Sequence, residues 1–128
     1  MATAAASVME DIRFDLVTRE QLDAMEPAAL DMLPFGVVGL DPAGLADRYN
    51  ATESRLAGLS TEKVLGRHFF ETIGQCTNNF MVAQRFDDEA DLDTIVPYVL
   101  TLRMRPTPVR LRLLQVSGAA RRYVLIQR

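Results

Sequence analysis

The sequence predicts an α+β fold built on a central antiparallel sheet of about five or six strands, with short helices packed on one face. Its strand-like and helix-like segments follow the order strand, strand, short helices, longer helix and three strands. The last strands alternate apolar and charged residues, as half-buried strands do. With 128 residues, 48% of them apolar, the chain is long enough to bury one core, so we expect a single domain.

Two short helices are predicted within residues 9–31. Thr18, with Gln21 three residues later, fits a capping box, in which each side chain bonds the backbone of the other residue. Pro27 suits the first turn of the second helix, where its missing N–H costs nothing.

Two strands joined by a tight turn are expected next. Residues 33–40 are apolar throughout, which predicts a strand buried on both faces, and residues 45–49 return as its partner. Residues 41–44 read Asp-Pro-Ala-Gly, with proline second and glycine fourth, as a tight turn prefers.

The stretch 49–77 holds the only cysteine and the only histidine of the chain. Asn50 is a good N-cap for a helix that ends at Gly58. Glu53 lies three residues after the cap, so its side chain is expected to turn back towards Tyr49. Two hydrogen-bonding groups would then share one face.

The second half of this stretch predicts another short helix and an aromatic pair. Ser60 or Thr61 would cap the helix, and Gly66 would end it. Phe69 and Phe70 follow, and then Cys76. The whole stretch is expected to fold over as the wall of a pocket.

Residues 78–90 predict the longer helix, which Asn78 or Asn79 would cap. Apolar residues expected to face the core recur every three to four positions: Phe80, Ala83, Phe86 and Ala90. Five acids crowd residues 87–93, where the helix dipole disfavours negative charge, so the helix should end early.

Three strands are expected to close the chain. In residues 95–105, Leu100, Leu102 and Met104 would face one side of the sheet. A turn at residues 106–108 leads to a strand in which Val109, Leu111 and Leu113 alternate with Arg110 and Arg112. After residues 117–118, a last strand covers residues 121–127.

Residues from 33 to about 116 resemble the photoactive yellow protein family of blue-light receptors. The residues that carry the resemblance are Leu33–Gly36, Leu40–Asp41, Tyr49–Ala51, Glu53, Gly58, Val64, Gly66, Phe69–Phe70, Cys76–Thr77, Met104 and Pro106–Thr107. The resemblance implies a PAS fold, with residues 1–31 as an N-terminal helical cap on the other sheet face and residues 32–128 as the photosensory core. The first thirty residues match the family in character only.

The resemblance also implies a cofactor. Photoactive yellow proteins hold 4-hydroxycinnamic acid (p-coumaric acid) as a thioester on a cysteine, which is Cys76 here. Tyr49 and a protonated Glu53 would then donate hydrogen bonds to the phenolate, because burial raises the pKa of a carboxyl. Light would isomerise the double bond, Glu53 would give up its proton, and the newly bare carboxylate would force the structure to reorganise.

The resemblance assigns Phe69, Phe70 and Met104 to the pocket and shows two departures. The family often has a threonine where Ala57 stands and an arginine where Leu59 stands, so both of those polar groups are lost here. Arg55, on the same short helix, is a candidate substitute for the missing charge.

Charge is unevenly placed along the chain. Residues 1–100 hold all 17 acids and seven of the 14 bases, whereas residues 101–128 hold seven arginines and no acid. The arginine stripe is Arg103, Arg105, Arg110 and Arg112. Because the protein is acidic overall and no aromatic residue interleaves the arginines, we expect no nucleic-acid partner. Instead, this sheet face should meet the acidic N-terminal segment.

The composition of the chain also limits its possible partners and its cellular location. No apolar run approaches the roughly 20 residues that cross a bilayer, and residues 1–8 lack the basic start of a signal peptide. The sequence therefore predicts a cytoplasmic protein without a membrane partner. One cysteine and one histidine favour neither a disulfide nor a zinc site, so no metal is expected.

The expected function is a blue-light photoreceptor without enzymatic turnover, which signals to an unknown downstream protein. The alternative is a chromophore-free PAS ligand-binding or protein-interaction module with a structural or redox-sensing Cys76. A cysteine-nucleophile enzyme is disfavoured, because no second histidine and no Asn or Asp motif around His68 would form a relay.

Overall fold

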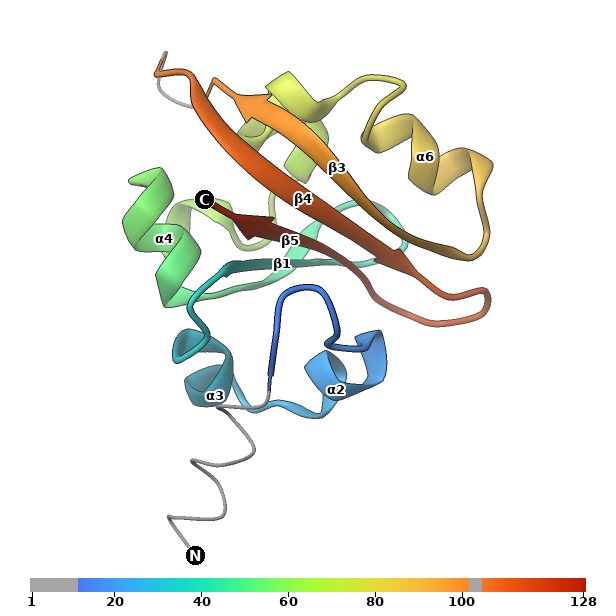
Figure 1. The fold of residues 1–128 in the computed structure, drawn as a ribbon, viewed down its shortest axis with the longest axis horizontal. Helices are drawn as coiled ribbons and strands as arrows, with labels where there is room; N and C mark the ends of the chain where they lie inside the picture. Colours follow the sequence, from blue (N-terminus) through green and yellow to red (C-terminus); the bar gives the residue numbers. More distant parts are fainter. Residues whose placement is uncertain (1–11, 102–104) are drawn as a thin grey trace, which may run out of the picture.

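The computed structural model describes residues 12–101 and 105–128, and its centre is a five-stranded sheet in the order β2-β1-β5-β4-β3 (Figure 1). All four neighbouring strand pairs are antiparallel. The strands are β1 (Gly36–Leu40), β2 (Ala46–Tyr49), β3 (Leu92–Leu100), β4 (Thr107–Gln115) and β5 (Arg122–Gln127). The predicted α+β class with an antiparallel sheet is therefore confirmed.

The two faces of the sheet bury separate apolar clusters, because successive side chains of a strand point to opposite faces. In β5, Val124 and Ile126 join the first cluster, whereas Tyr123 and Leu125 join the second. The first cluster also holds Phe86 and packs under the helices that follow β2. The second cluster is covered by the N-terminal segment.

Helices lie on both sides of the sheet, with α2 and α3 on one side and α4 and α6 on the other in Figure 1. The α-helices are α2 (Arg19–Ala24), α3 (Pro27–Asp31), α4 (Ala51–Ala57), α5 (Thr61–Val64) and α6 (Ala83–Asp88). A π-helical turn, η1 (Phe69–Ile73), and a 3₁₀ turn, η2 (Gln75–Thr77), connect α5 to α6. The helices are short, so tertiary packing rather than intrinsic propensity stabilises them.

The capping predictions for α2, α3 and α4 are confirmed. Thr18 forms the expected capping box, and Pro27 lies in the first turn of α3. The Asn50 side chain caps α4, and Gly58 ends that helix in the left-handed conformation with φ 72°. Ser60 occupies the N-cap position of α5 but makes no capping bond with its side chain.

Several strand bounds differ from the predictions. β1 begins at Gly36 rather than at residue 33, and β3 runs from Leu92 to Leu100 instead of 95–105. The turn predicted at residues 106–108 is wrong in part, because β4 already begins at Thr107 and Pro108 pairs with Val99. β3 is an edge strand, where proline is tolerated, and it also contains Pro97.

The prediction that Phe80 and Ala90 face the core is wrong, since Phe80 is 77% exposed and Ala90, which follows the end of α6, is exposed too. α6 begins only at Ala83, after Val82, and no side chain caps it. The Asn79 side chain is engaged elsewhere: its oxygen accepts from Met81 N–H and its amide donates to the carbonyl of Cys76. The early end of α6 at Asp88, before most of the acids, agrees with the prediction.

The N-terminal segment packs on the arginine-bearing face of β4, as predicted, but backbone groups make much of the contact. Arg112 is 4% exposed and donates to the carbonyls of Phe14 (3.0 Å) and Val17 (2.6 Å). It also forms a two-bond ion pair with Asp93 of β3. The guanidinium of Arg110 lies 5.3 Å from the centre of the Phe14 ring. Arg103 lies outside the described residues.

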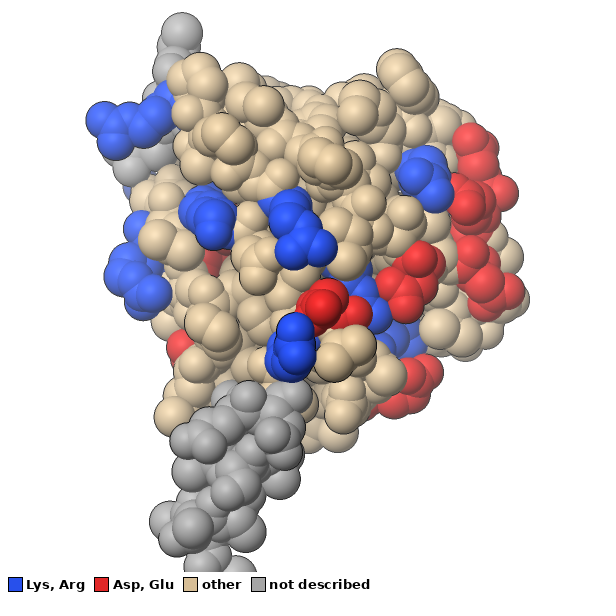
Figure 2. Space-filling view, viewed as in Figure 1, with Lys and Arg blue, Asp and Glu red and all other residues tan. Residues whose placement is uncertain are grey.

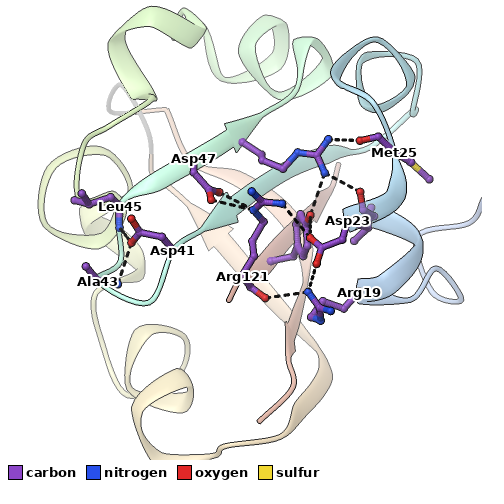
Figure 3. Close-up of polar contacts among 11 residues, drawn as sticks. Arg19, Asp23, Met25, Asp41, Ala43, Leu45, Asp47 and Arg121 are labelled. Carbon is purple, nitrogen blue, oxygen red and sulfur yellow. Dashed lines mark hydrogen bonds and ion pairs between the residues drawn. The ribbon is translucent and has the colours of Figure 1, made fainter. Parts of the chain in front are cut away.

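An acidic residue of α2 makes the charged contact between the N-terminal segment and the sheet. Asp23 pairs with Arg19 and with Arg121, which also pairs with Asp47 of β2 (Figure 3). The hydroxyl of Tyr123 donates to the same carboxylate at 2.6 Å. Although burial raises the pKa of Asp23, its bonds to Tyr123, Arg19 and Arg121 leave it below its ordinary value.

Candidate functional site

Tyr49 brings a buried hydroxyl to the end of β2. The residue is 7% exposed, and its hydroxyl has no hydrogen-bond partner among the described residues. Burial, with a smaller contribution from the charge of Glu53, raises the pKa of Tyr49, so the phenol keeps its proton. A buried donor without a partner is costly and marks a place where a ligand acceptor would be stabilised.

Glu53 lies beside it, held by the short helix α4. The N–H of Glu53 donates to the side chain of Asn50, which fixes the first turn of the helix. The carboxyl is 2% exposed and points over the start of β1, where a Cβ at Gly36 would lie 2.1 Å from Oε1. A glycine at position 36 is therefore what makes room for this carboxyl.

The Glu53 carboxyl bonds to Arg128 and not to Tyr49. Arg128 Nη1 donates to Oε1 at 2.7 Å, and Nη2 donates to Oε2 at 3.2 Å. This arginine is itself mostly buried, with 17% of its side chain exposed. Burial nevertheless outweighs the favourable effect of Arg128, so the pKa of Glu53 is raised above its ordinary value.

A small apolar cavity lies between these polar groups and the sheet. Its walls include Tyr49, Glu53, Leu59 and Phe69, together with Gly74 and Thr77 on either side of Cys76, and its free volume is about 10 Å³. That space is about the size of one water molecule. The rings of Phe69 and Phe70 pack edge to face at a centroid distance of 5.4 Å.

Cys76 is a free, half-buried thiol in η2 that packs against the same core cluster as Tyr49, Phe69 and Phe70. Two side chains hold its backbone carbonyl: the hydroxyl of Tyr98 donates at 2.5 Å and the amide of Asn79 at 3.2 Å. Asn79 also donates to the Tyr98 hydroxyl at 2.6 Å. The peptide group of Cys76 is thus fixed in orientation.

The remaining predicted site residues are more dispersed. Leu59 lies on the cavity wall, whereas Ala57, one helical turn after Glu53, lines a different cleft at the C-terminal end of α4. Phe70 packs 6.1 Å from Phe86, between the pocket wall and α6. His68 accepts from the N–H of Glu71 and begins η1, which is a structural role. Met104 lies outside the described residues.

Sequence reasoning missed Arg128 and Tyr98, although strand alternation could have assigned both to the sheet face that carries the site. Val124 and Ile126 face the first apolar cluster, so position 128 falls on the same side of the chain, towards α4. Tyr98 is two residues before the buried Leu100 and packs against the same cluster. Both residues therefore belong to the face that carries the site.

The hydrogen-bond donors of this site suit a buried phenolate attached to Cys76. The cavity, however, is too small for the aromatic ring of such a group. The partnerless hydroxyl of Tyr49 supplies one donor, and Glu53, once protonated, would supply a second. The free volume of about 10 Å³ requires wall side chains such as the half-buried Leu59 to move when an aromatic group enters.

The described residues offer neither a metal site nor a membrane-spanning helix. They contain no group of three or more His, Cys, Asp or Glu side chains that could hold a metal ion. None of the helices within the described ranges is long and apolar enough to cross a membrane.

Comparison with known proteins points to one family. No family model matches the chain. A photoactive yellow protein of Rhodothalassium salexigens is 32% identical over 125 residues, which cover 94% of this chain and 99% of that protein. Another from Halochromatium salexigens is 33% identical over 92 residues, covering 70% of this chain and 74% of that protein.

The fold leads to the same family. The photoactive yellow protein domain of the sensor histidine kinase Ppr from Rhodospirillum centenum matches with a TM-score of 0.79 and 34% identity, over 86% of this chain and 99% of that one. The PAS domain of an HTR-like protein from Haloarcula marismortui matches with a TM-score of 0.60 at 19% identity, over 84% and 97%, which supports the PAS fold alone. The chain therefore belongs to the photoactive yellow protein family of photoreceptor PAS domains.

Proposed function

We propose that this domain is a blue-light photoreceptor in which Cys76 carries a 4-hydroxycinnamoyl group as a thioester. The observation that carries the proposal is the buried Tyr49 hydroxyl, which has no partner among the described residues and lies beside the buried Glu53. Cys76 packs against the same core cluster, so a group attached there would extend towards these two residues. We propose sensing without enzymatic turnover.

Each pocket residue would have a separate task. The bound group supplies absorption of blue light and isomerisation of its double bond. Tyr49, whose pKa is raised, stays protonated and would donate a hydrogen bond to the phenolate oxygen. Phe69 and Leu59 exclude water from that oxygen, which strengthens the hydrogen bonds to it. Tyr98 and Asn79 fix the peptide of Cys76 and so position its sulfur.

Glu53 would hold a proton in the dark and pass it to the phenolate oxygen after light absorption, which would leave a neutral phenol and the Glu53 carboxylate. Its raised pKa supports the protonated form. Arg128 opposes that form, because a guanidinium stabilises the carboxylate. We propose that Glu53 changes partner, donating to the phenolate in the dark and returning as a carboxylate to Arg128 afterwards.

The signal would leave through the N-terminal segment. We propose residues 1–31 as a cap and residues 32–128 as the sensory core, because this segment packs on the sheet face opposite the site, through an apolar cluster and through polar groups such as Arg112 and Asp23. The downstream partner would be another signalling protein, and a cytoplasmic location remains a prediction.

A second candidate is a chromophore-free PAS module with a redox-sensing Cys76. The cavity of about 10 Å³ and the half-buried thiol favour it, because they require no bound group. Absorption spectra distinguish the two. After incubation with activated 4-hydroxycinnamic acid, the photoreceptor should gain a visible band that light bleaches and darkness restores. Glu53→Gln and Tyr49→Phe should shift that band, since each alters a bond to the phenolate. A band that neither substitution moves would contradict the assigned pocket.

A further inference from the structure

A cleft at the C-terminal end of α4 gathers three arginines from three separate parts of the chain. Arg55 comes from α4, Arg105 precedes β4, and Arg128 follows β5. The cleft has a volume of about 400 Å³. In Figure 2 basic side chains gather on the side of α4, and acidic ones on the side of α6. We call this feature the arginine cleft.

Among the described residues, only Arg128 of the three cleft arginines is paired with an acid, the buried Glu53. None of its described lining residues is acidic. Arg55 and Arg105 are exposed, and neither side chain has a hydrogen bond or ion pair within the described part of the chain. Arg112 and Arg121, by comparison, each pair with an aspartate. Like charges held close together repel, so an anion between them would be stabilised.

Arg128 is the fixed element of the cleft. Two of its N–H groups bond to the buried Glu53, which leaves further donors of its five for the cleft. The planar fork of a guanidinium suits an oxyanion with two or more oxygens. Because Glu53 is 2% exposed, it anchors the guanidinium without occupying the cleft.

We propose that the arginine cleft binds a small multivalent oxyanion of the phosphate or carboxylate class, held by Arg55, Arg105 and Arg128. Binding itself does not depend on the proposed photochemistry. Its link to the photoreceptor site is Arg128, which would touch both the anion and Glu53. An anion there would weaken the field of Arg128 at Glu53 and so favour the protonated carboxyl.

Titration of inorganic phosphate into the full chain without chromophore tests the proposal by calorimetry, with sodium chloride holding the ionic strength constant. Saturable binding at one site is expected. Arg55→Gln and Arg105→Gln should each weaken binding by about fivefold to tenfold, because each removes charge-assisted hydrogen bonds. Arg67→Gln is the matched control: Arg67 is exposed and does not line the cleft.

Two further titrations extend the experiment. Citrate, titrated in parallel, shows whether a carboxylate or a phosphate is preferred. Glu53→Gln should tighten binding, because it removes the negative charge beneath Arg128. Binding that does not saturate, or that Arg67→Gln weakens as much as Arg55→Gln does, would overturn the proposal in favour of diffuse surface charge. Because no chromophore is present, this outcome leaves the proposed photochemistry untouched.

Discussion

Replacing Arg128 by glutamine should destabilise the protein in a pH-dependent way. The substitution removes both hydrogen bonds and the positive charge from a carboxyl that is 2% exposed. If Glu53 stays charged, an uncompensated buried carboxylate costs about 3–5 kcal/mol. If it takes up a proton instead, the cost is set by the distance of the pH from the unfolded pKa of about 4.3, at 1.36 kcal/mol per unit.

The cheaper of these two states of Glu53, charged or protonated, sets the loss in free energy of unfolding that we expect for Arg128→Gln at each pH. At pH 5 protonation costs about 1 kcal/mol, so the free energy of unfolding should fall by little more than the lost hydrogen bonds. At pH 8 protonation costs nearly 5 kcal/mol, so the loss should reach about 3–5 kcal/mol. The sign follows from Arg128, which lowers the pKa of Glu53 against the larger effect of burial, so its removal raises that pKa further. Stability from a raised pKa is complete below the unfolded value and is lost as the pH rises through the folded value, so the variant should lose more at high pH.

Urea unfolding at pH 5 and pH 8 measures this difference. The matched control is Arg128→Gln in a Glu53→Gln background, where no carboxylate remains and the loss should be small at both pH values. Equal losses for Arg128→Gln at pH 5 and pH 8, or the same pH dependence in the control background, would refute a buried Arg128–Glu53 pair.

Four other substitutions test the pocket, the helix cap and the N-terminal contact. Ala57→Thr and Leu59→Arg should each lower the pH at which the bound phenolate is protonated, by somewhat under one unit, in a titration of the dark spectrum. Asn50→Ala should lower the free energy of unfolding in urea by about 2–4 kcal/mol, because this buried side chain bonds four backbone groups. Arg112→Gln should speed hydrogen exchange in α2 and α3 more than Arg110→Gln does, since only Arg112 bonds the Phe14 and Val17 carbonyls.

Each of these expectations can fail separately. An unchanged protonation midpoint in both Ala57→Thr and Leu59→Arg would mean that another group already stabilises the phenolate. A loss below about 0.5 kcal/mol for Asn50→Ala would show that water replaces its bonds. Equal exchange rates in Arg112→Gln and Arg110→Gln would mean that apolar packing alone holds the N-terminal segment.

Features set by neighbouring residues could be predicted from the sequence. The cap at Asn50, the capping box at Thr18 and the turn at 41–44 depend on side chains that bond backbone a few residues away. Alternation in β4 likewise assigned residues to the two sheet faces. The closeness of Tyr49 and Glu53 could be predicted because Tyr49 lies just before α4 and Glu53 lies in its first turn.

Features that depend on distant contacts could not be predicted in this way. Arg128 pairs with Glu53 across 75 positions, and no local pattern indicates that bond. The start of α6 depends on Asn79, which bonds Tyr98 of β3 and the carbonyl of Cys76 instead of capping a helix. Phe80 was therefore placed on a helix that begins three residues later.

The central claim is that Cys76 carries the 4-hydroxycinnamoyl group, and peptide mass spectrometry tests it most directly. Protein incubated with activated 4-hydroxycinnamic acid is digested, and the peptide that contains Cys76 is weighed beside the same peptide from Cys76→Ala. The account predicts the added mass of one 4-hydroxycinnamoyl group on the wild-type peptide alone, lost on treatment with hydroxylamine, which cleaves thioesters. An unmodified Cys76 peptide, or the same added mass on Cys76→Ala protein, would contradict it.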